Sequence, residues 1–236
     1  MLAVFVNVIT VLLGSAIGIL FRNKINKNLI SAIVTALALV TITIGVINAI
    51  KTNDILCVII CLALGTLIGE LIKVDDGIEK TGDFIKEKLL KGKEKNDSFS
   101  EGFVTACIVF CVGSMTITGS FEAGINGNYS IIYTKSALDF VTATAFSATM
   151  GIGVAFASLF VLVFQGGLTL LAELIAPYLS AVIVTEMSAI GGVILIGMGI
   201  NMLNLKVDKI KVANMLPAIF LTLLYFPIYN LILSLI

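Results

Sequence analysis

The sequence predicts an all-α, polytopic membrane protein built as a bundle of about eight transmembrane helices. Apolar residues make up 58% of the 236 residues, charged residues make up 13%, and the mean hydropathy is +1.10. Soluble domains average about 45–50% apolar and about 25% charged residues. Several apolar runs approach the roughly 20 residues that a helix needs to cross a bilayer, and they lack the two-residue alternation of barrel strands. These observations predict helices in lipid.

The charge balance and the rare residue types exclude several function classes. Lys and Arg together number 15, as do Asp and Glu, so no basic excess indicates nucleic acid as a partner. The chain has no His, which removes the usual Ser-His-Asp and Cys-His arrangements and the imidazole ligands of zinc sites. The four Cys lie in apolar helices, and we interpret them as core residues. We expect neither an enzyme nor a cofactor.

Seven apolar segments are clear candidate spans. In chain order they are residues 3–21, 29–50, 55–72, 102–118, 154–174, 179–203 and 212–235. Each has roughly the length that the hydrocarbon core of a bilayer demands. We expect residues 1–236 to form a single membrane domain, in contact with the lipid bilayer over most of its surface.

Segment 131–149 decides the number of spans. It is largely apolar but carries Lys135 and Asp139. Basic residues gather in three loops, after the first and third spans and before the last, and short basic loops face the cytoplasm. All three loops can do so only if segment 131–149 crosses. We therefore predict eight spans in the inner (cytoplasmic) membrane with both termini outside. The alternative is seven spans plus a re-entrant element, which the short glycine connector 150–153 favours.

Residues 74–100 form the one extended polar stretch between spans. Ile78, Ile85 and Leu89 recur at helical spacing among Asp, Glu and Lys, and three more lysines follow. This pattern predicts a cytoplasmic amphipathic and basic insert near anionic lipid headgroups. A solvated linker explains the same composition equally well.

Three short stretches resemble one another: residues 13–20 (LGSAIGIL), 64–71 (LGTLIGEL) and 196–203 (IGMGINML). They indicate a duplicated helical hairpin, although convergence on small and aliphatic residues gives the same appearance. Gly14 with Gly18, and Gly65 with Gly69, lie one turn apart on a helix face. Such faces allow close helix packing, either within the chain or in a homodimer.

Asp139 is the polar residue most in need of an explanation. A charge within the hydrocarbon costs at least about 2.5–3.5 kcal/mol on insertion scales. Lys135 lies four residues earlier, on the same helix face. The two side chains form either a local ion pair that relieves both charges, or a site at an aqueous cavity where Asp139 exchanges a proton or a cation and Lys135 tunes its charge.

The end of the fourth span is dense in glycine and hydroxyl groups. Ser114, Thr116 and Thr118 alternate there between Gly113 and Gly119. An unwound helix at this point would present oxygens to a hard cation, whereas small-residue packing is the competing interpretation. In the eight-span topology this stretch, Lys135 and Asp139 lie in the outward half of the membrane. Three more polar side chains are expected at the same depth: Gln165, Glu186 and Asn7.

Several motifs carry a resemblance to a known family. They are residues 110–120 (FCVGSMTITGS), 135–139 (KSALD), 151–154 (GIGV), 165–166 (QG) and 214–218 (NMLPA). With these motifs, nearly the whole chain resembles the YqgA/YdfK-like bacterial membrane proteins, a family of unknown function. The resemblance implies a bacterial inner-membrane protein of similar length and supplies no catalytic residues.

These observations favour a small membrane transporter or channel for a monovalent cation or a proton. Asp139 is the expected charged site, and Ser114, Thr116 and Thr118 are the expected oxygen donors. The alternative is a non-transporting membrane scaffold or signalling protein that acts through its cytoplasmic insert, with the Lys135–Asp139 pair bracing helices. We expect a small ion or solute and the bilayer as partners, and no nucleic acid.

Overall fold

The computed structural model describes residues 1–22, 26–78, 80–81, 84, 98–111, 113–175, 177, 179–205 and 208–235. Within these ranges the protein is all-helical, as the sequence predicts. The long helices are α1 (Leu2–Arg22), α2 (Lys27–Ala49), α3 (Ile55–Ile72), α5 (Ser98–Cys111), α6 (Ser114–Ile125), α7 (Ser130–Met150), α8 (Gly153–Leu170), α10 (Ala181–Met202) and α11 (Pro217–Leu235). Two short elements, α9 (Ala172–Ile175) and the 3₁₀ helix η2 (Val212–Met215), precede α10 and α11.

Local sequence explains where several of these helices begin and end. The Asp54 side chain accepts hydrogen bonds from the first amides of α3, and Ser180 does the same for α10. Both are residue types preferred at this position, because a short side-chain oxygen satisfies amides that lack a partner within the helix. Pro217 opens α11, where proline loses no helical hydrogen bond. Apolar segments and their polar boundaries thus define the elements.

The described helices make this a multi-pass membrane protein. Six of them are long and apolar enough to cross a membrane, and the bent pair α5–α6 makes a seventh if it is one span. Helix α7 is not among these candidates, because polar residues lower its hydropathy. Its 21 residues nevertheless measure about 30 Å at 1.5 Å per residue, the thickness of the hydrocarbon core. The count of eight spans stays a prediction.

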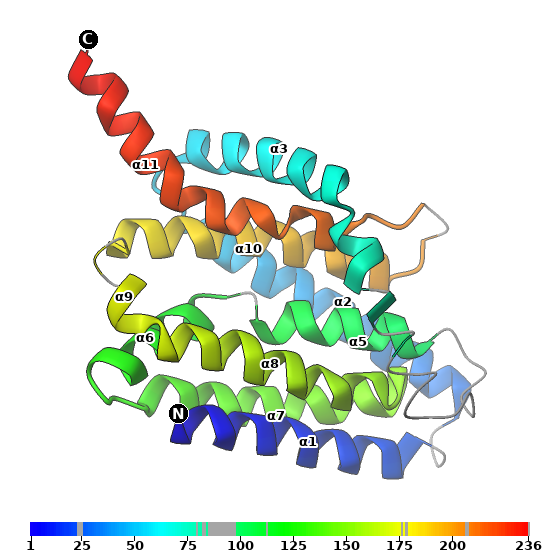
Figure 1. Cartoon of the computed structure of the whole chain (residues 1–236). Helices are drawn as coiled ribbons and strands as arrows, with labels where there is room; N and C mark the ends of the chain where they lie inside the picture. Colours follow the sequence, from blue (N-terminus) through cyan, green and yellow to red (C-terminus); the bar gives the residue numbers. More distant parts are fainter. Residues whose placement is uncertain are drawn as a thin grey trace.

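The helices form two groups that lie side by side (Figure 1). The α1 group contains α1, α5, α6, α7, α8 and α9, and the α10 group contains α2, α3, α10 and α11. Within the groups, glycines bring backbones together: Gly14 and Gly18 lie against α7, Gly45 against α10, and Gly65 against α11. The chain passes between the groups three times, after α1, after α3 and after α9.

These contacts bear on the predicted repeat and the predicted homodimer. Gly14 meets Phe140 and Gly18 meets Thr144, so α7 runs parallel to α1. Gly65 meets Ala218 while Gly69 meets Asn214, so α11 runs antiparallel to α3. The matching glycines therefore have unlike surroundings, and they are covered by helices of the same chain. The repeat and the homodimer both stay predictions, and neither gains support from these two faces.

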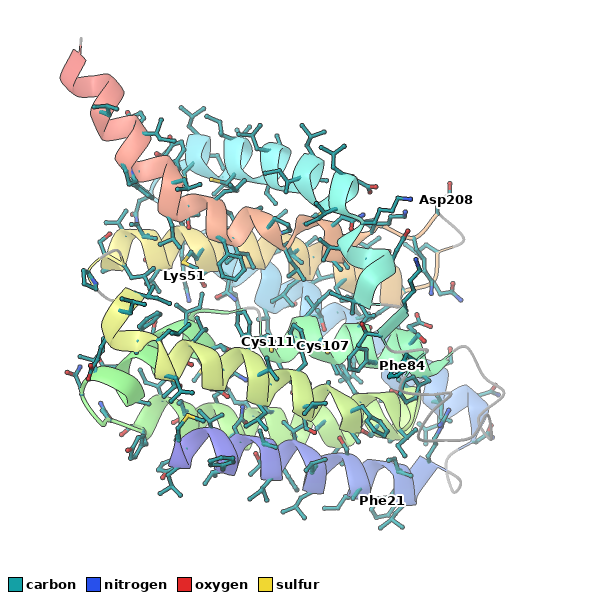
Figure 2. All side chains as sticks on the ribbon, viewed as in Figure 1. Phe21, Lys51, Phe84, Cys107, Cys111 and Asp208 are labelled. Carbon is teal, nitrogen blue, oxygen red and sulfur yellow. The ribbon has the colours of Figure 1, made fainter. Side chains whose placement is uncertain are left out.

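The two ends of the bundle differ in charge. We name them the Lys51 end and the Asp208 end after residues labelled in Figure 2. Helix α1 begins and α11 ends at the Lys51 end (Figure 1). The other end carries Arg22 beside Gly151, and Lys209 lies 3.5 Å from Glu101. By the positive-inside rule the Asp208 end faces the cytoplasm, which stays a prediction.

Most of the predicted insert, at 74–100, lies outside the described residues. Residues 74–78 continue in helical conformation after α3. There the Asp75 amide donates to the Asn214 side chain over 2.7 Å, and the Asp75 carboxylate accepts from the Ala213 amide over 3.2 Å. Partial burial raises the pKa of Asp75, although the Ala213 amide and Lys211 oppose this effect. These bonds join the start of the insert to η2.

Candidate functional site

Four of the predicted site residues meet in one buried cluster between α1, α7 and α8. The ammonium group of Lys135 forms an ion pair with Asp139 Oδ2. The same oxygen accepts a hydrogen bond from Asn7 Nδ2 over 3.0 Å. That nitrogen also donates to Gln165 Oε1 over 2.9 Å. We call these four residues, Asn7, Lys135, Asp139 and Gln165, the polar cluster.

Close packing of α1 on α7 assembles this cluster. A Cβ atom on Gly14 would lie 2.4 Å from the Phe140 carbonyl oxygen, and one on Gly18 would lie 2.2 Å from that of Thr144. Two glycines one turn apart thus let the two backbones touch. About two turns before Gly14, Asn7 can reach across the same interface to Asp139. The glycine motif and the polar cluster are parts of one helix contact.

The polar cluster has hydrogen-bonding capacity left over. Asn7 and Gln165 are fully buried, and Lys135 and Asp139 are 5% and 7% exposed. Within the described part of the chain, Asn7 Oδ1 and Gln165 Nε2 have no hydrogen-bond partner. Leaving a buried polar atom unpaired costs about 1–3 kcal/mol. One acceptor and one donor therefore remain available beside the Asp139 carboxylate.

The predicted break in the fourth span lies next to this cluster. Helices α5 and α6 meet at an angle of 57°, and Gly113 between them has a φ of 156°. Helix α5, which ends at Cys111, packs against α7, the helix that carries Lys135 and Asp139. The Thr116 hydroxyl donates to the Phe110 carbonyl across the break over 3.1 Å. The break therefore lies between two helices, α5 and α6, that both pack against the helix of the Lys135–Asp139 pair.

The sequence left two interpretations open for the glycine and hydroxyl run from 113 to 120, an unwound helix and small-residue packing. In the structure α6 starts at Ser114, so most of this run is helical. Thr116 and Thr118 are therefore helical, and Thr118 lines a cavity at the Lys51 end instead of the polar cluster. The side chain of Ser114 lies outside the described part of the structure. Short side chains in this run serve helix packing as well, since Gly119 lies against Ile131 and Ile132 of α7.

Glu186 lies apart from the polar cluster, in the α10 group. Its carboxylate is fully buried and accepts hydrogen bonds from the Thr52 hydroxyl, from the Asn53 amide over 2.7 Å and from the Asp54 amide over 3.3 Å. The turn between α2 and α3 thus wraps around this carboxylate. The Tyr225 hydroxyl in turn donates to Asp54 over 3.0 Å. Glu186 holds a turn, and a single pocket does not unite all the predicted site residues.

Three cavities follow α10 from one end of the bundle to the other. The outer cavity, about 380 Å³, lies at the Lys51 end between α6 and the start of α10. A small apolar cavity of about 60 Å³ lies at the helix break and includes Cys111 and Met187. The inner cavity, about 350 Å³, lies at the Asp208 end and includes Thr105 and Met198. Figure 2 shows Cys107 and Cys111 midway between the two ends.

Sequence reasoning missed the charged groups of the outer cavity. Lys51 and Glu122 line this cavity. Both lie near helix ends, where charged residues are common, so neither stands out in the sequence. Only the scarcity of charge at this end could have drawn attention to them. The cysteines behave as predicted core residues, because all four are buried and free. The described residues contain no group of three or more acidic or Cys side chains suited to a metal ion.

Comparison with known proteins gives the family of this chain. The family described as "Protein of unknown function (DUF554)" matches residues 2–227. This chain belongs to the DUF554 family. A DUF554 relative in Escherichia coli K12, "Uncharacterized protein YqgA", is 29% identical over 221 residues, which cover 93% of each chain. The "Uncharacterized membrane protein YdfK" of Bacillus subtilis 168 is 28% identical over 218 residues, which cover 90% of each chain. No solved structure matches this DUF554 chain. The resemblance expected from the motifs is confirmed.

Proposed function

We propose that this protein is a small membrane transporter or channel for a monovalent cation or a proton. The observation that carries the proposal is the polar cluster, in which the Asp139 carboxylate is buried with Lys135 between three helices. Ionisable groups inside a membrane are costly, and they occur chiefly where an ion or proton passes. The inner (cytoplasmic) membrane, with both termini outside, is the location that accompanies this proposal.

The proposed chemistry follows from charge balance in the polar cluster. The Lys135 ammonium neutralises Asp139, so a cation that reaches the same carboxylate leaves one positive charge in excess. A buried net charge is expensive, and the excess disappears if Lys135 releases a proton as the cation binds. Asn7 Oδ1, a buried acceptor with no partner among the described residues, is suited to complete the cation's oxygen shell. Exchange of one cation for one proton is the resulting cycle.

The helix break supports an access route to this cluster. Cys111 lines the small cavity at the break, and its helix, α5, packs against α7, which carries Lys135 and Asp139. Phe121 and Leu179 line both the small cavity and the outer cavity. An ion from the Lys51 end would therefore pass these two apolar side chains, then the carboxyl end of α5, before it meets Asp139. Broken helices offer backbone carbonyls to cations in this manner.

Cation flux into proteoliposomes tests the proposal. The wild type should carry a cation under a Na⁺, K⁺ or proton gradient, and Asp139→Asn should abolish that flux because it removes the charge that binds the cation. Glu70→Gln is the matched control, since Glu70 is an exposed carboxylate at the far end of α3 and should leave flux unchanged. Size-exclusion elution and thermal unfolding establish that each variant folds.

The rival is a scaffold or signalling protein in which the Lys135–Asp139 pair braces α7 against α1 and α8. That interpretation predicts no flux from folded wild-type protein under any of the three gradients. It also predicts that Asp139→Asn lowers the unfolding temperature, because Lys135 is left buried without its partner. The absence of flux together with a lower unfolding temperature for Asp139→Asn would refute the transporter proposal and favour the scaffold.

A further inference from the structure

The outer cavity combines separated charges with apolar walls. It is lined by Lys51 from the α2–α3 turn, by Glu122 and Thr118 from α6, and by Thr185 and Ser188 from α10. Apolar side chains from the same elements complete it. Its volume of about 380 Å³ falls in the range of roughly 300–1,000 Å³ that is typical of small-molecule sites. The cavity is therefore large enough for a small organic solute.

The two charged residues of this cavity, Lys51 and Glu122, do not pair with each other. In the part of the chain that the structure describes, neither Lys51 nor Glu122 forms an ion pair. Glu122 accepts one hydrogen bond, from the Asn126 side chain over 3.2 Å. Two opposite charges that face one cavity without pairing leave a positive and a negative pole for a ligand.

The helix dipoles strengthen both poles. Helix α10 begins at Ala181, which lines the cavity, so the positive end of a 22-residue helix lies on the same cavity as Lys51. Helix α6 ends at Ile125, which also lines the cavity, so the negative end of α6 accompanies Glu122. Each helix end is equivalent to about half an elementary charge. A carboxylate is favoured at the first pole and an ammonium group at the second.

Ser188 adds a buried hydroxyl group without a protein partner to the wall of the cavity. Its side chain is 2% exposed and lines the cavity, and its hydroxyl has no hydrogen-bond partner among the described residues. Thr185, one turn earlier, donates to the Ala181 carbonyl and keeps its acceptor capacity. A buried hydroxyl without a partner is costly, and a ligand with polar groups would satisfy it.

We propose that the outer cavity binds a small zwitterionic solute with an apolar substituent, of the class of the free aliphatic α-amino acids. The carboxylate would lie toward Lys51 and the start of α10, and the ammonium group toward Glu122 and the end of α6. A plain anion would leave Glu122 without a group of opposite charge, and a plain cation would do the same to Lys51. The site is separate from the polar cluster, so binding does not depend on Asp139.

Calorimetric titration of the purified protein tests the proposal with three ligands that share one side chain. L-leucine has both charges, its methyl ester keeps only the ammonium group, and 4-methylpentanoate keeps only the carboxylate. L-alanine, L-valine and L-serine are titrated as well, so that side-chain size does not decide the result. We expect at least one zwitterion to bind, and for leucine we expect each single-charge analogue to bind at least about tenfold more weakly.

Variants of the cavity provide the second arm. Lys51→Gln and Glu122→Gln should each weaken zwitterion binding at least about tenfold, and Lys80→Gln, an exposed lysine at the other end of the bundle, should not. Asp139→Asn should bind the zwitterion as the wild type does, whatever its flux. The proposal is wrong if no zwitterion binds, if the methyl ester binds as well as leucine, or if both cavity variants bind normally.

Discussion

At the scale of single residues, two carboxylates are buried among the described residues, and their surroundings differ. Asp139 faces the ammonium group of Lys135 on its own helix and the side-chain amide of Asn7 on α1. Glu186 faces a hydroxyl and two backbone amides, which are neutral and fixed. A carboxylate held only by such donors stabilises a turn and has no partner with which to exchange charge. We therefore propose a role in transport for Asp139 and a structural role for Glu186.

Replacing Glu186 by Ala should destabilise the fold without a direct effect on transport. The Asn53 and Asp54 amides would lose their acceptor, and we expect a loss of about 2–4 kcal/mol in the free energy of unfolding. A lower midpoint of thermal unfolding in detergent would register it. Glu173→Ala removes an exposed carboxylate at the same end and should leave the midpoint unchanged. Equal midpoints for wild type and Glu186→Ala would contradict the assignment.

Asp139 and Glu186 also show how much of the candidate site could be predicted from the sequence. Helical spacing put Lys135 and Asp139 on one face, and the topology put Asn7, Gln165 and Glu186 at a similar depth. Depth follows from position along a span, whereas the direction in which a side chain points around the bundle depends on which helices become neighbours. Asn7 and Gln165 share a helix group with Asp139, and Glu186 belongs to the other group. Sequence alone contained no information on that division.

At the scale of secondary-structure elements, the contact between α1 and α7 depends on two glycines. Gly18→Ala would place a methyl group 2.2 Å from the Thr144 carbonyl oxygen. Overpacking of this kind costs about 1–3 kcal/mol, and separation of the helices would also pull Asn7 away from Asp139. We expect a lower unfolding midpoint and reduced cation flux. The unfolding midpoint and the cation flux of Gly18→Ala are measured in the same assays as those of Asp139→Asn.

Gly167 is the matched control for Gly18. It also lies within a helix, α8, but no atom lies within 4 Å of the position its Cβ would take. Gly167→Ala should therefore keep or raise the midpoint, since Ala favours helix over Gly by about 1 kcal/mol. A Gly18→Ala protein as stable as this control would show that the close contact of α1 with α7 is not required.

Boundaries of the elements were predictable where turn chemistry is local. Asp54, Ser180 and Pro217 are typical of helix starts, and the structure uses all three there. The bend between α5 and α6 was predictable only in outline, because glycines and hydroxyls are compatible both with an unwound stretch and with a packed helix. Packing against α7 and α8 decides between them, and this information is not local.

At the scale of the whole molecule, the positions of the two ends relative to the membrane follow from the number of spans. Asn53 lies at the Lys51 end and Asp208 at the opposite end, and the side chains of both are exposed. The four native cysteines are buried, so we expect only an introduced, exposed cysteine to react with a thiol reagent. With eight spans, Asn53→Cys should react with a membrane-impermeant maleimide in intact spheroplasts, and Asp208→Cys should react only after permeabilisation.

The alternative topology gives a different result in the same experiment. If residues 131–149 re-enter the membrane instead of crossing it, α8 and α10 must run in the opposite direction from that in the described fold, where Glu186 near the start of α10 binds the α2–α3 turn, and Asp208 lies outside. Both cysteines would then react in intact spheroplasts. Reaction of Asp208→Cys alone would reverse the orientation of the whole bundle and contradict the positive-inside assignment.

The three passages of the chain between helix groups have a consequence for synthesis. Helix α1 reaches the membrane before its partners α7 and α8, which are made after α2, α3, α5 and α6. Until then Asn7 lacks its hydrogen-bond partners Asp139 and Gln165, and no helix of this bundle covers the face of α1 that carries Gly14 and Gly18. Helix α2 likewise waits for α10, and α3 waits for α11. Helices α1, α2 and α3 must therefore remain unpaired in the membrane or be held by the insertion machinery until their partners are made. The packing of α3 is complete only after α11 has been inserted.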